Sequence, residues 1–212
     1  MKLQDVLETT GACRFYRPDP VPDDVLASVL DAARYAPTGG NRQPVRLIAV
    51  RDPDKKRQLK AWYLPIWDTY VAQAKQRAAP TAGRARILAN ADHFAQHLDA
   101  IPVLIVVCAV MADLYPTDAT LGRLSIVGGA SVYPAVQNLM LKARAEGLGT
   151  ALTTLLCLVE AQVKALLQIP DGVGTAAMIA LGYPEKPFPT RLRRRPLGAM
   201  AFMDAYGTPL PG

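Results

Sequence analysis

The chain has 212 residues, half of them apolar, which suits one domain with a full hydrophobic core over residues 1–212. Its formal net charge of +6 does not indicate a nucleic-acid partner, because basic residues are interleaved with acidic ones, as between Asp52 and Lys60. Three widely separated cysteines, Cys13, Cys108 and Cys157, argue against a disulfide framework or a CxxC zinc site, and we expect reduced thiols.

Membrane insertion and secretion are not indicated either. No charged leader followed by an apolar run opens the chain, and the longest apolar stretch, residues 101–111, is shorter than the roughly 20 residues of a membrane-spanning helix. We therefore expect a cytoplasmic protein that has no membrane partner.

In chain order, the first part predicts helices that precede one strand. A short helix over residues 1–7 leads into an irregular segment over 8–15, after which two prolines force an extended path. Residues 22–35 begin with acidic side chains and carry apolar residues at helical spacing, which predicts a helix with one buried face. A strand is expected over residues 45–50.

The next stretch predicts helical structure of decreasing regularity. A helix should begin at Pro53 and run to about Trp62. From residue 63 to 96 the pattern is looser because Pro65, Pro80 and Gly83 interrupt it, and this stretch is expected to form a helical lid or arm.

The second half contains the clearest strand. Residues 101–110 form a continuous β-branched run of the kind that is buried on both faces, so the strand belongs in the centre of a sheet. Residues 120–146 predict a helix that Pro134 kinks or divides, and Gly147 ends it. The remaining expected elements are a short strand and loop over 150–157, a helix over 160–167, a core strand over 174–182 and an extended, proline-rich arm over 183–212.

Residues 36–44 join the second helix to the first strand and are equipped for binding. Pro37 ends the helix, while Gly39 and Gly40 allow backbone angles that a side chain would forbid. Asn41 and Gln43 then present amides that donate and accept hydrogen bonds. By itself such a stretch is also typical of an ordinary connection rich in turn formers.

Several common functional motifs are absent. The chain contains no Rossmann-type GxGxxG after a strand, no Walker loop, no HExxH and no GxSxG. His93 and His97 stand four residues apart on a possible helix, but no acidic residue or cysteine is placed beside them as a third ligand. A solvated or packing role is therefore favoured over a metal site, and no metal is expected.

Five fragments in order resemble the FMN-dependent nitroreductase family, and together they cover nearly the whole chain. They are residues 14–22 (RFYRPDPVP), 32–44 (AARYAPTGGNRQP), 137–150 (a QNL helix ending in EGLGT), 160–170 (an apolar helix ending in LQIP) and 181–184 (LGYP). The resemblance implies an α+β fold with a mostly antiparallel central sheet flanked by helices. It also implies an intertwined homodimer in which an extended carboxy-terminal arm, here residues 183–212, reaches onto the partner.

The resemblance further implies non-covalent binding of FMN at the dimer interface. The family's amino-terminal phosphate motif, of the Arg-Arg-Ser-x-Arg type, corresponds to Thr10-Gly11-Ala12-Cys13-Arg14, of which only Arg14 is kept. The hydroxyl of Thr10 and the backbone of Gly11 are partial replacements. Near the other end of the chain, Arg193 and Arg195 match the basic pair that closes on the phosphate in relatives.

Two further groups of residues correspond to family contacts with the flavin ring. Asn41 and Gln43 match amides near the flavin, and Pro37 and Thr38 approach from the other subunit. The loop at Thr153, Thr154 and Leu155 matches the place where relatives direct backbone amides to the N5 and O4 edge, which favours charge in the reduced ring.

The implied reaction is a ping-pong cycle in which NADH or NADPH passes hydride to FMN and an electron-poor nitroaromatic or quinone then takes its place. Aromatic residues of the 63–96 region and the preceding helix could form the walls of the pocket, and core packing is the alternative role for them: Trp62, Tyr63, Trp67, Tyr70 and Phe94. Two other functions stay open. They are a non-redox flavin-binding or flavin-delivering protein, and a divergent family member with another flavin or deazaflavin reaction.

Overall fold

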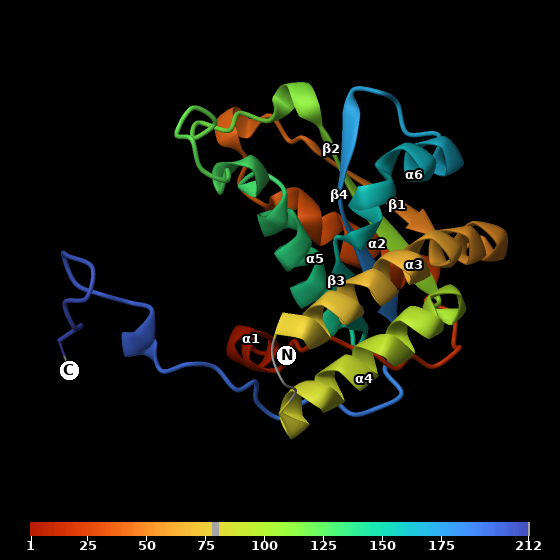
Figure 1. Cartoon of the computed structure of the whole chain (residues 1–212), viewed down its shortest axis with the longest axis horizontal. Coiled ribbons are helices and arrows are strands. Elements are labelled where there is room, and N and C mark those ends of the chain that lie inside the picture. The colour runs from red at the N-terminus through yellow and green to blue at the C-terminus, as the bar shows by residue number, and fades with distance from the viewer. Residues whose placement is uncertain (78–80, 212) are drawn as a thin grey trace.

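The computed structural model describes residues 1–77 and 81–211, and its centre is an antiparallel sheet with the strand order β1-β2-β4-β3 (Figure 1). The fold is α+β, in agreement with the prediction. The strands are β1 Val45–Val50, β2 Val103–Val110, β3 Gly149–Thr153 and β4 Val173–Gly182. The helices are α1 Leu3–Thr9, α2 Asp23–Asp31, α3 Pro53–Arg77, α4 Ala82–Gln96, α5 Tyr133–Ala145 and α6 Glu160–Leu167.

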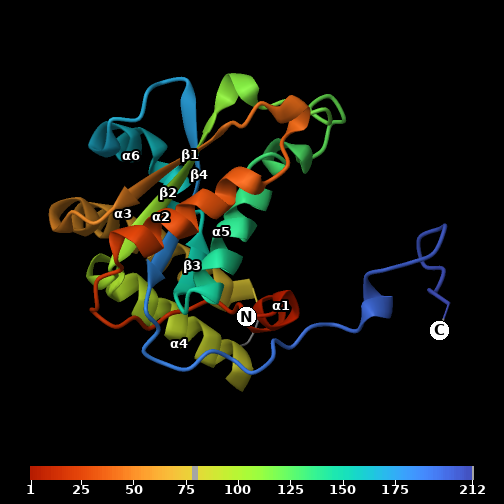
Figure 2. The same ribbon diagram turned by 180° about the vertical axis from the view of Figure 1, so that it is seen from behind.

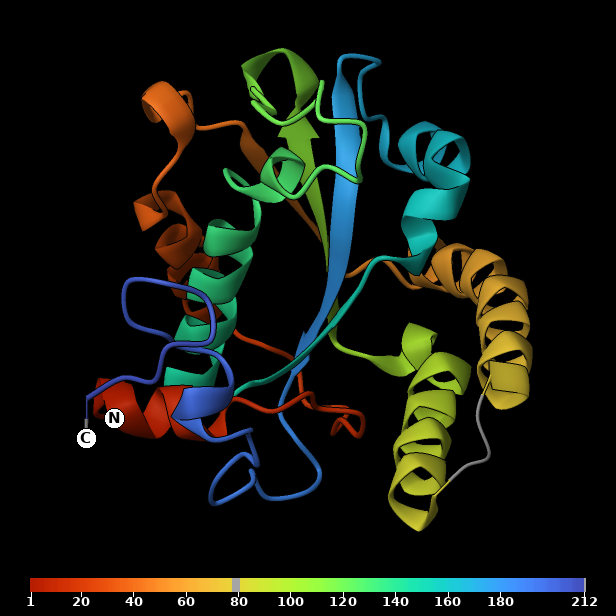
Figure 3. The same ribbon diagram turned by 60° about the vertical axis from the view of Figure 1, so that its left-hand side comes forward.

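Helices cover both faces of the sheet. Successive side chains of a strand point to opposite faces, and β2 is apolar throughout, so it supplies both cores. Val103, Ile105 and Val107 pack in the cluster under α2 and α5, whereas Leu104 and Val106 pack in the cluster under α3, α4 and α6. Figure 3 shows α5 on one side of the strands and α3, α4 and α6 on the other. The expected central position of this strand is confirmed.

The expected helix end near Trp62 is wrong, because α3 continues through Pro65 to Arg77. Proline in a helix interior removes one hydrogen bond and costs roughly 3 kcal/mol. Tyr63 and Trp67, on either side of it, are only 3% and 6% exposed, and burying two large aromatic side chains offsets that cost. Pro80 lies outside the described residues.

The segment that precedes α5 is not the helix that its apolar spacing predicts. Residues 120–132 form a loop with one short 3-10 turn over Val127–Gly129, and Pro134 stands in the first turn of α5. The buried Asp118 carboxylate organises this loop, since it accepts hydrogen bonds from the Ile126 N–H at 2.8 Å and the Ser125 hydroxyl at 2.7 Å. Pro134 therefore neither kinks a long helix nor divides it into two, because α5 begins beside it and a loop precedes it.

The chain after β4 first follows the body and then leaves it. Pro184 pairs with Tyr16, and the Phe188 ring lies against the guanidinium of Arg144, 3.8 Å from its centroid. Beyond residue 192 the described part of the tail extends away from the sheet and helices, as Figures 1 and 2 show from opposite sides. Among the described residues, no helix has the length and apolar character needed to cross a bilayer.

Candidate functional site

The loop over residues 36–44 is held in an unusual backbone conformation. Gly40, Asn41 and Gln43 have φ angles of 58°, 53° and 50°. For a residue with a side chain, this left-handed region costs on the order of 1 kcal/mol, and such strain clusters at binding sites. The Gln43 N–H donates to Thr38 Oγ1 at 3.2 Å, and its side-chain amide donates to Asn41 Oδ1 at 3.2 Å. Both amide side chains are exposed, so the loop presents them outward.

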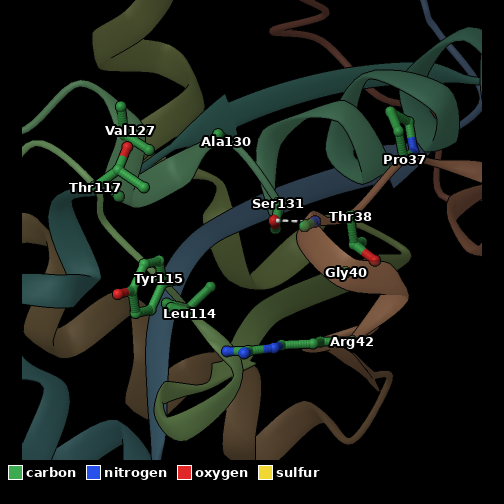
Figure 4. Close-up of a pocket in the computed structure, with 12 residues that line it drawn as sticks. Pro37, Thr38, Gly40, Arg42, Leu114, Tyr115, Thr117, Val127, Ala130 and Ser131 are labelled. Atoms are coloured by element: carbon green, nitrogen blue, oxygen red, sulfur yellow. Dashed lines mark hydrogen bonds between the residues drawn. The ribbon is translucent and has the colours of Figure 1, made fainter.

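This loop forms one wall of a pocket of about 480 Å³ (Figure 4). The Gly39 N–H donates to Ser131 Oγ at 3.1 Å, which ties the loop to the segment before α5. Across the pocket, the Arg42 guanidinium lies 5.8 Å from the centroid of the Tyr115 ring. The other lining residues are Pro37, Thr38, Gly40, Leu114, Thr117, Val127, Gly128 and Ala130.

At the opposite end of the sheet, the amino-terminal segment docks on β3. Ala12 forms a parallel bridge with Thr150, and the Cys13 N–H donates to the Thr150 carbonyl at 2.8 Å. A Cβ at Gly149 would lie 2.7 Å from Cys13 Cβ, so only glycine permits this approach. The docking fixes the backbone from which the partly buried Arg14 projects.

Arg14 lines a pocket of about 250 Å³ between the end of β3 and the helices α3 and α4. The Trp67 and Tyr70 rings stack with centroids 5.7 Å apart, and the Tyr63 hydroxyl lies 3.3 Å from Thr153 Oγ1. Burial raises the pKa of Tyr63, so its hydroxyl stays protonated at neutral pH. The other lining residues are Ala91, Phe94, Leu152, Thr154 and Leu155. We call this space the aromatic pocket.

Four of the five aromatic residues expected around a pocket line the aromatic pocket, and Trp62 does not. Trp62 is partly buried and packs against the core beneath α3. Tyr63, Trp67 and Phe94 belong to that same core while they also border the pocket, so the two roles weighed for them coexist.

Arg14 also lines a second pocket, of about 330 Å³, which we call the cationic pocket. It lies between residues 11–15 and the tail segment 184–192, and Lys186 and Asn90 border it. In the part of the chain that the structure describes, no carboxylate lies within 4.0 Å of the charged group of Arg14 or Lys186. Sequence reasoning missed Lys186, whose only signal was its place in a proline-rich stretch just after the last core strand.

The remaining candidate phosphate residues differ in position. The Thr10 hydroxyl donates to the Val6 carbonyl at 2.6 Å, and Gly11 and Ala12 line the cationic pocket. Arg193 and Arg195 are exposed on the departing tail and line neither pocket that Arg14 borders.

Within one copy of the chain, the structure does not bring the two groups of candidate residues together. Pro44, at the end of the loop, accepts a hydrogen bond from Val110, whereas Val103 at the other end of β2 pairs with Leu181 beside Thr150. Seven residue steps of a strand separate these ends by about 20 Å. The loop amides and Arg14 therefore face different spaces of one chain.

The two histidine rings take part in a stack of aromatic rings. The His93 ring stacks between Phe15, at a centroid distance of 4.2 Å, and His97, at 4.1 Å. No group of three or more potential metal ligands occurs in the described part of the chain. The packing role weighed for these residues accounts for both rings.

Comparison with known proteins agrees with this architecture. The model of the nitroreductase family matches residues 8–183. The chain is 31% identical over 188 residues to a Thermus thermophilus protein named NADH dehydrogenase, and the match covers 84% of each chain.

Solved structures share the fold at low sequence identity. A nitroreductase with bound FMN from Desulfitobacterium hafniense has a TM-score of 0.67 and 19% identity, and the match covers 92% of this chain and 95% of that one. The NADPH:FMN oxidoreductase from Vibrio harveyi, in complex with NAD+, also has a TM-score of 0.67 and 19% identity, with coverage of 96% and 77%. From the family match over most of its length and the shared fold, the chain belongs to the nitroreductase family.

Proposed function

We propose that the protein is an FMN-dependent oxidoreductase that uses NADH or NADPH to reduce nitroaromatic, quinone or similar electron-poor acceptors. The observation that carries the proposal is the position of Arg14, which borders both the aromatic pocket and the cationic pocket. An aromatic pocket and a cationic pocket that share one guanidinium have the layout of a ring joined to a phosphate. The names of the relatives, which include NADH dehydrogenase and an FMN-bound nitroreductase, support the same ligands.

The residues present fit FMN chemically. A partly buried guanidinium without a carboxylate partner among the described residues carries an uncompensated charge, which a phosphate dianion would neutralise. The rings of Tyr63, Trp67 and Tyr70 offer apolar surface to a flat heterocycle. Bound FMN would supply two-electron redox chemistry between the nicotinamide and the acceptor.

The side chains of this chain would bind and orient rather than act as acids or bases. Arg14 would hold the phosphate end, and the backbone at Thr153, Thr154 and Leu155 would meet the edge of the ring. The hydrogen bond between Tyr63 and Thr153 keeps that turn in place, and the buried aromatic side chains exclude water from it. NADH or NADPH and the acceptor would bind in turn beside the bound ring, with the aromatic side chains as walls, which gives ping-pong kinetics.

The complete site would require a second copy of the chain. The outward amides of Asn41 and Gln43 lie at the other end of the sheet from Arg14, so the loop of one copy would complete the pocket of its partner. Large apolar side chains are exposed as expected for a surface that a partner covers. They include Leu121 at 61%, Leu124 at 89% and Ile126 at 78%, and on the tail Leu197 at 65%, Met200 at 74% and Tyr206 at 96%. Of the arm over residues 183–212, the part beyond residue 192 would reach onto that partner.

The test uses the purified full chain. We expect it to bind FMN with the absorbance of a flavoprotein, to sediment as a dimer, and to oxidise NADH or NADPH only when a nitroaromatic or quinone acceptor is present. Bound FMN without oxidation of either nicotinamide would overturn the enzyme proposal and favour a flavin-carrying protein. A monomer that takes up no FMN at saturating concentration would overturn the cofactor proposal as well.

A further inference from the structure

The cationic pocket contains a second positive side chain whose position follows from the tail. Residues 184–189 include three prolines, which restrict the backbone, and Pro184 pairs with Tyr16. This path holds Lys186 with its Nζ 3.2 Å from the centroid of the Phe15 ring. The ring of Phe15 is in turn stacked on His93. A cation over an aromatic face is attracted by the ring, so the ammonium is held at the wall of the pocket.

The amino-terminal segment cannot supply the same charge. The Thr10 hydroxyl donates to the carbonyl of Val6 within the chain. A Cβ at Gly11 would lie 3.3 Å from Leu192 Cδ2 and 3.3 Å from Pro189 Cγ. The tail therefore occupies the space that a longer side chain at this position would need. Arg14 is the only positively charged side chain of residues 10–14.

A phosphate dianion is held best by more than one cation, and charge-assisted hydrogen bonds to it are roughly twice as strong as neutral ones. Arg14 and Lys186 border one pocket, and neither has a carboxylate within 4.0 Å in residues 1–77 and 81–211. The other residues that line this pocket are apolar or neutral, among them Ala12, Phe15, Asn90, Pro187 and Phe188.

We propose that Lys186 binds the phosphate of FMN together with Arg14, in place of a cation from residues 10–12. This inference rests on the proposed function, because it assigns one more residue to the same cofactor site. The tail thus has two parts with different tasks. Residues 184–192 build the phosphate end of the site in their own copy, and only the segment beyond them departs from the body.

The experiment compares FMN with riboflavin, which has the same ring and ribityl chain but no phosphate. Dissociation constants of both are measured by quenching of flavin fluorescence for the wild-type chain, Lys186→Gln and Lys186→Arg. A matched control is Arg191→Gln, which removes one charge from the same tail segment at an exposed residue that lies 3.5 Å from the Glu8 carboxylate. Lys186 is itself exposed, so all variants should keep the wild-type circular dichroism spectrum and melting temperature.

We expect Lys186→Gln to raise the Kd for FMN by about tenfold or more, because it removes a charge-assisted hydrogen bond. Its Kd for riboflavin should stay within about twofold of the wild-type value, since the missing contact is to the phosphate alone. Lys186→Arg keeps the charge and should restore most of the FMN affinity, and Arg191→Gln should behave as the wild type.

Two outcomes would overturn the inference. Unchanged FMN affinity in Lys186→Gln would mean that the ammonium does not touch the phosphate, and equal weakening of FMN and riboflavin would mean that the side chain acts on the shape of the site. A wild-type chain that binds neither flavin would instead defeat the proposed function itself, and the inference with it.

Discussion

The two regions that carry candidate binding residues are built in different ways. The loop over residues 36–44 is local, because its strained angles at Asn41 and Gln43 and its hydrogen bond to Thr38 come from neighbours in the sequence. The surroundings of Arg14 are assembled from distant segments, since Ala12 pairs with Thr150 and the tail returns beside them. A short motif could thus reveal the loop, whereas the cationic pocket depends on the whole sheet.

The largest expected effect is at Arg14, which borders both pockets. Arg14→Gln should raise the Kd for FMN by about 100-fold, because it removes a guanidinium that would form two charge-assisted hydrogen bonds to the phosphate. Arg17→Gln is the matched control, since Arg17 is exposed and lies 3.3 Å from Asp19. Equilibrium dialysis with FMN measures both. Equal affinities for the two variants would remove Arg14 from the site.

Mixing two defective variants tests whether the two regions meet across a dimer. One copy carries Arg14→Gln, and the other carries Asn41→Ala with Gln43→Ala. If each site takes Arg14 from one copy and the loop from its partner, a mixed dimer has one intact site and one doubly altered site. Random exchange after unfolding and refolding should therefore restore FMN binding to about a quarter of all sites.

The alternative arrangement predicts a different result for the same mixture. If both regions served the same copy, every site would keep one defect, and the mixed sample would bind FMN no better than its two components measured apart. Two different affinity tags, one on each variant, provide the check that mixed dimers have formed, because only a mixed dimer is retained by both resins.

The docking of the amino-terminal segment on β3 should be sensitive to one methyl group. Gly149→Ala would place a Cβ 2.7 Å from both Cβ and Sγ of Cys13, and relieving that overlap should lower the free energy of unfolding by about 1–3 kcal/mol. Urea unfolding followed by circular dichroism measures the loss. Gly172→Ala, where no atom lies within 4 Å of the added Cβ, should change stability far less. Similar losses in both variants would contradict the close approach at Cys13.

The smallest effect concerns the segment that faces the 36–44 loop. Hydrogen bonds from the Ser125 hydroxyl and the Ile126 N–H lower the pKa of Asp118 from 3.8 to about 2. A carboxyl whose pKa is lower in the folded state stabilises the protein above about pH 4 and loses this contribution as the pH falls toward 2. At pH 7, Asp118→Asn should therefore unfold at a lower urea concentration than the wild type. The difference between the two urea midpoints should disappear near pH 2.

Denaturant midpoints at several pH values test the Asp118 prediction, with Asp113→Asn as a control in the same segment. A difference in midpoint between the wild type and Asp118→Asn that stays constant from pH 7 to pH 2 would show that the shape of this side chain, and not its charge, stabilises the protein.

The elements with strong periodic patterns were predictable from local sequence, and those held by tertiary contacts were not. β1 and α6 begin and end where their apolar patterns and turn residues indicate. The pattern failed at Pro65, because burial of Tyr63 and Trp67 outweighs the proline. It failed again over residues 120–132, because the Asp118 carboxylate offers the backbone N–H groups partners other than a helix.

By itself, the amino-acid sequence determined the positions of several helices and strands through side-chain periodicity and turn chemistry, which act over a few residues. Its resemblance to the nitroreductase family implied the α+β fold, which the structure has. Only the tertiary structure decided that Arg14 borders two pockets, that Lys186 reaches one of them and that the loop lies at the far end of the sheet. The physical reason is strand pairing, which sets residues such as Ala12 and Thr150 side by side although the chain separates them widely.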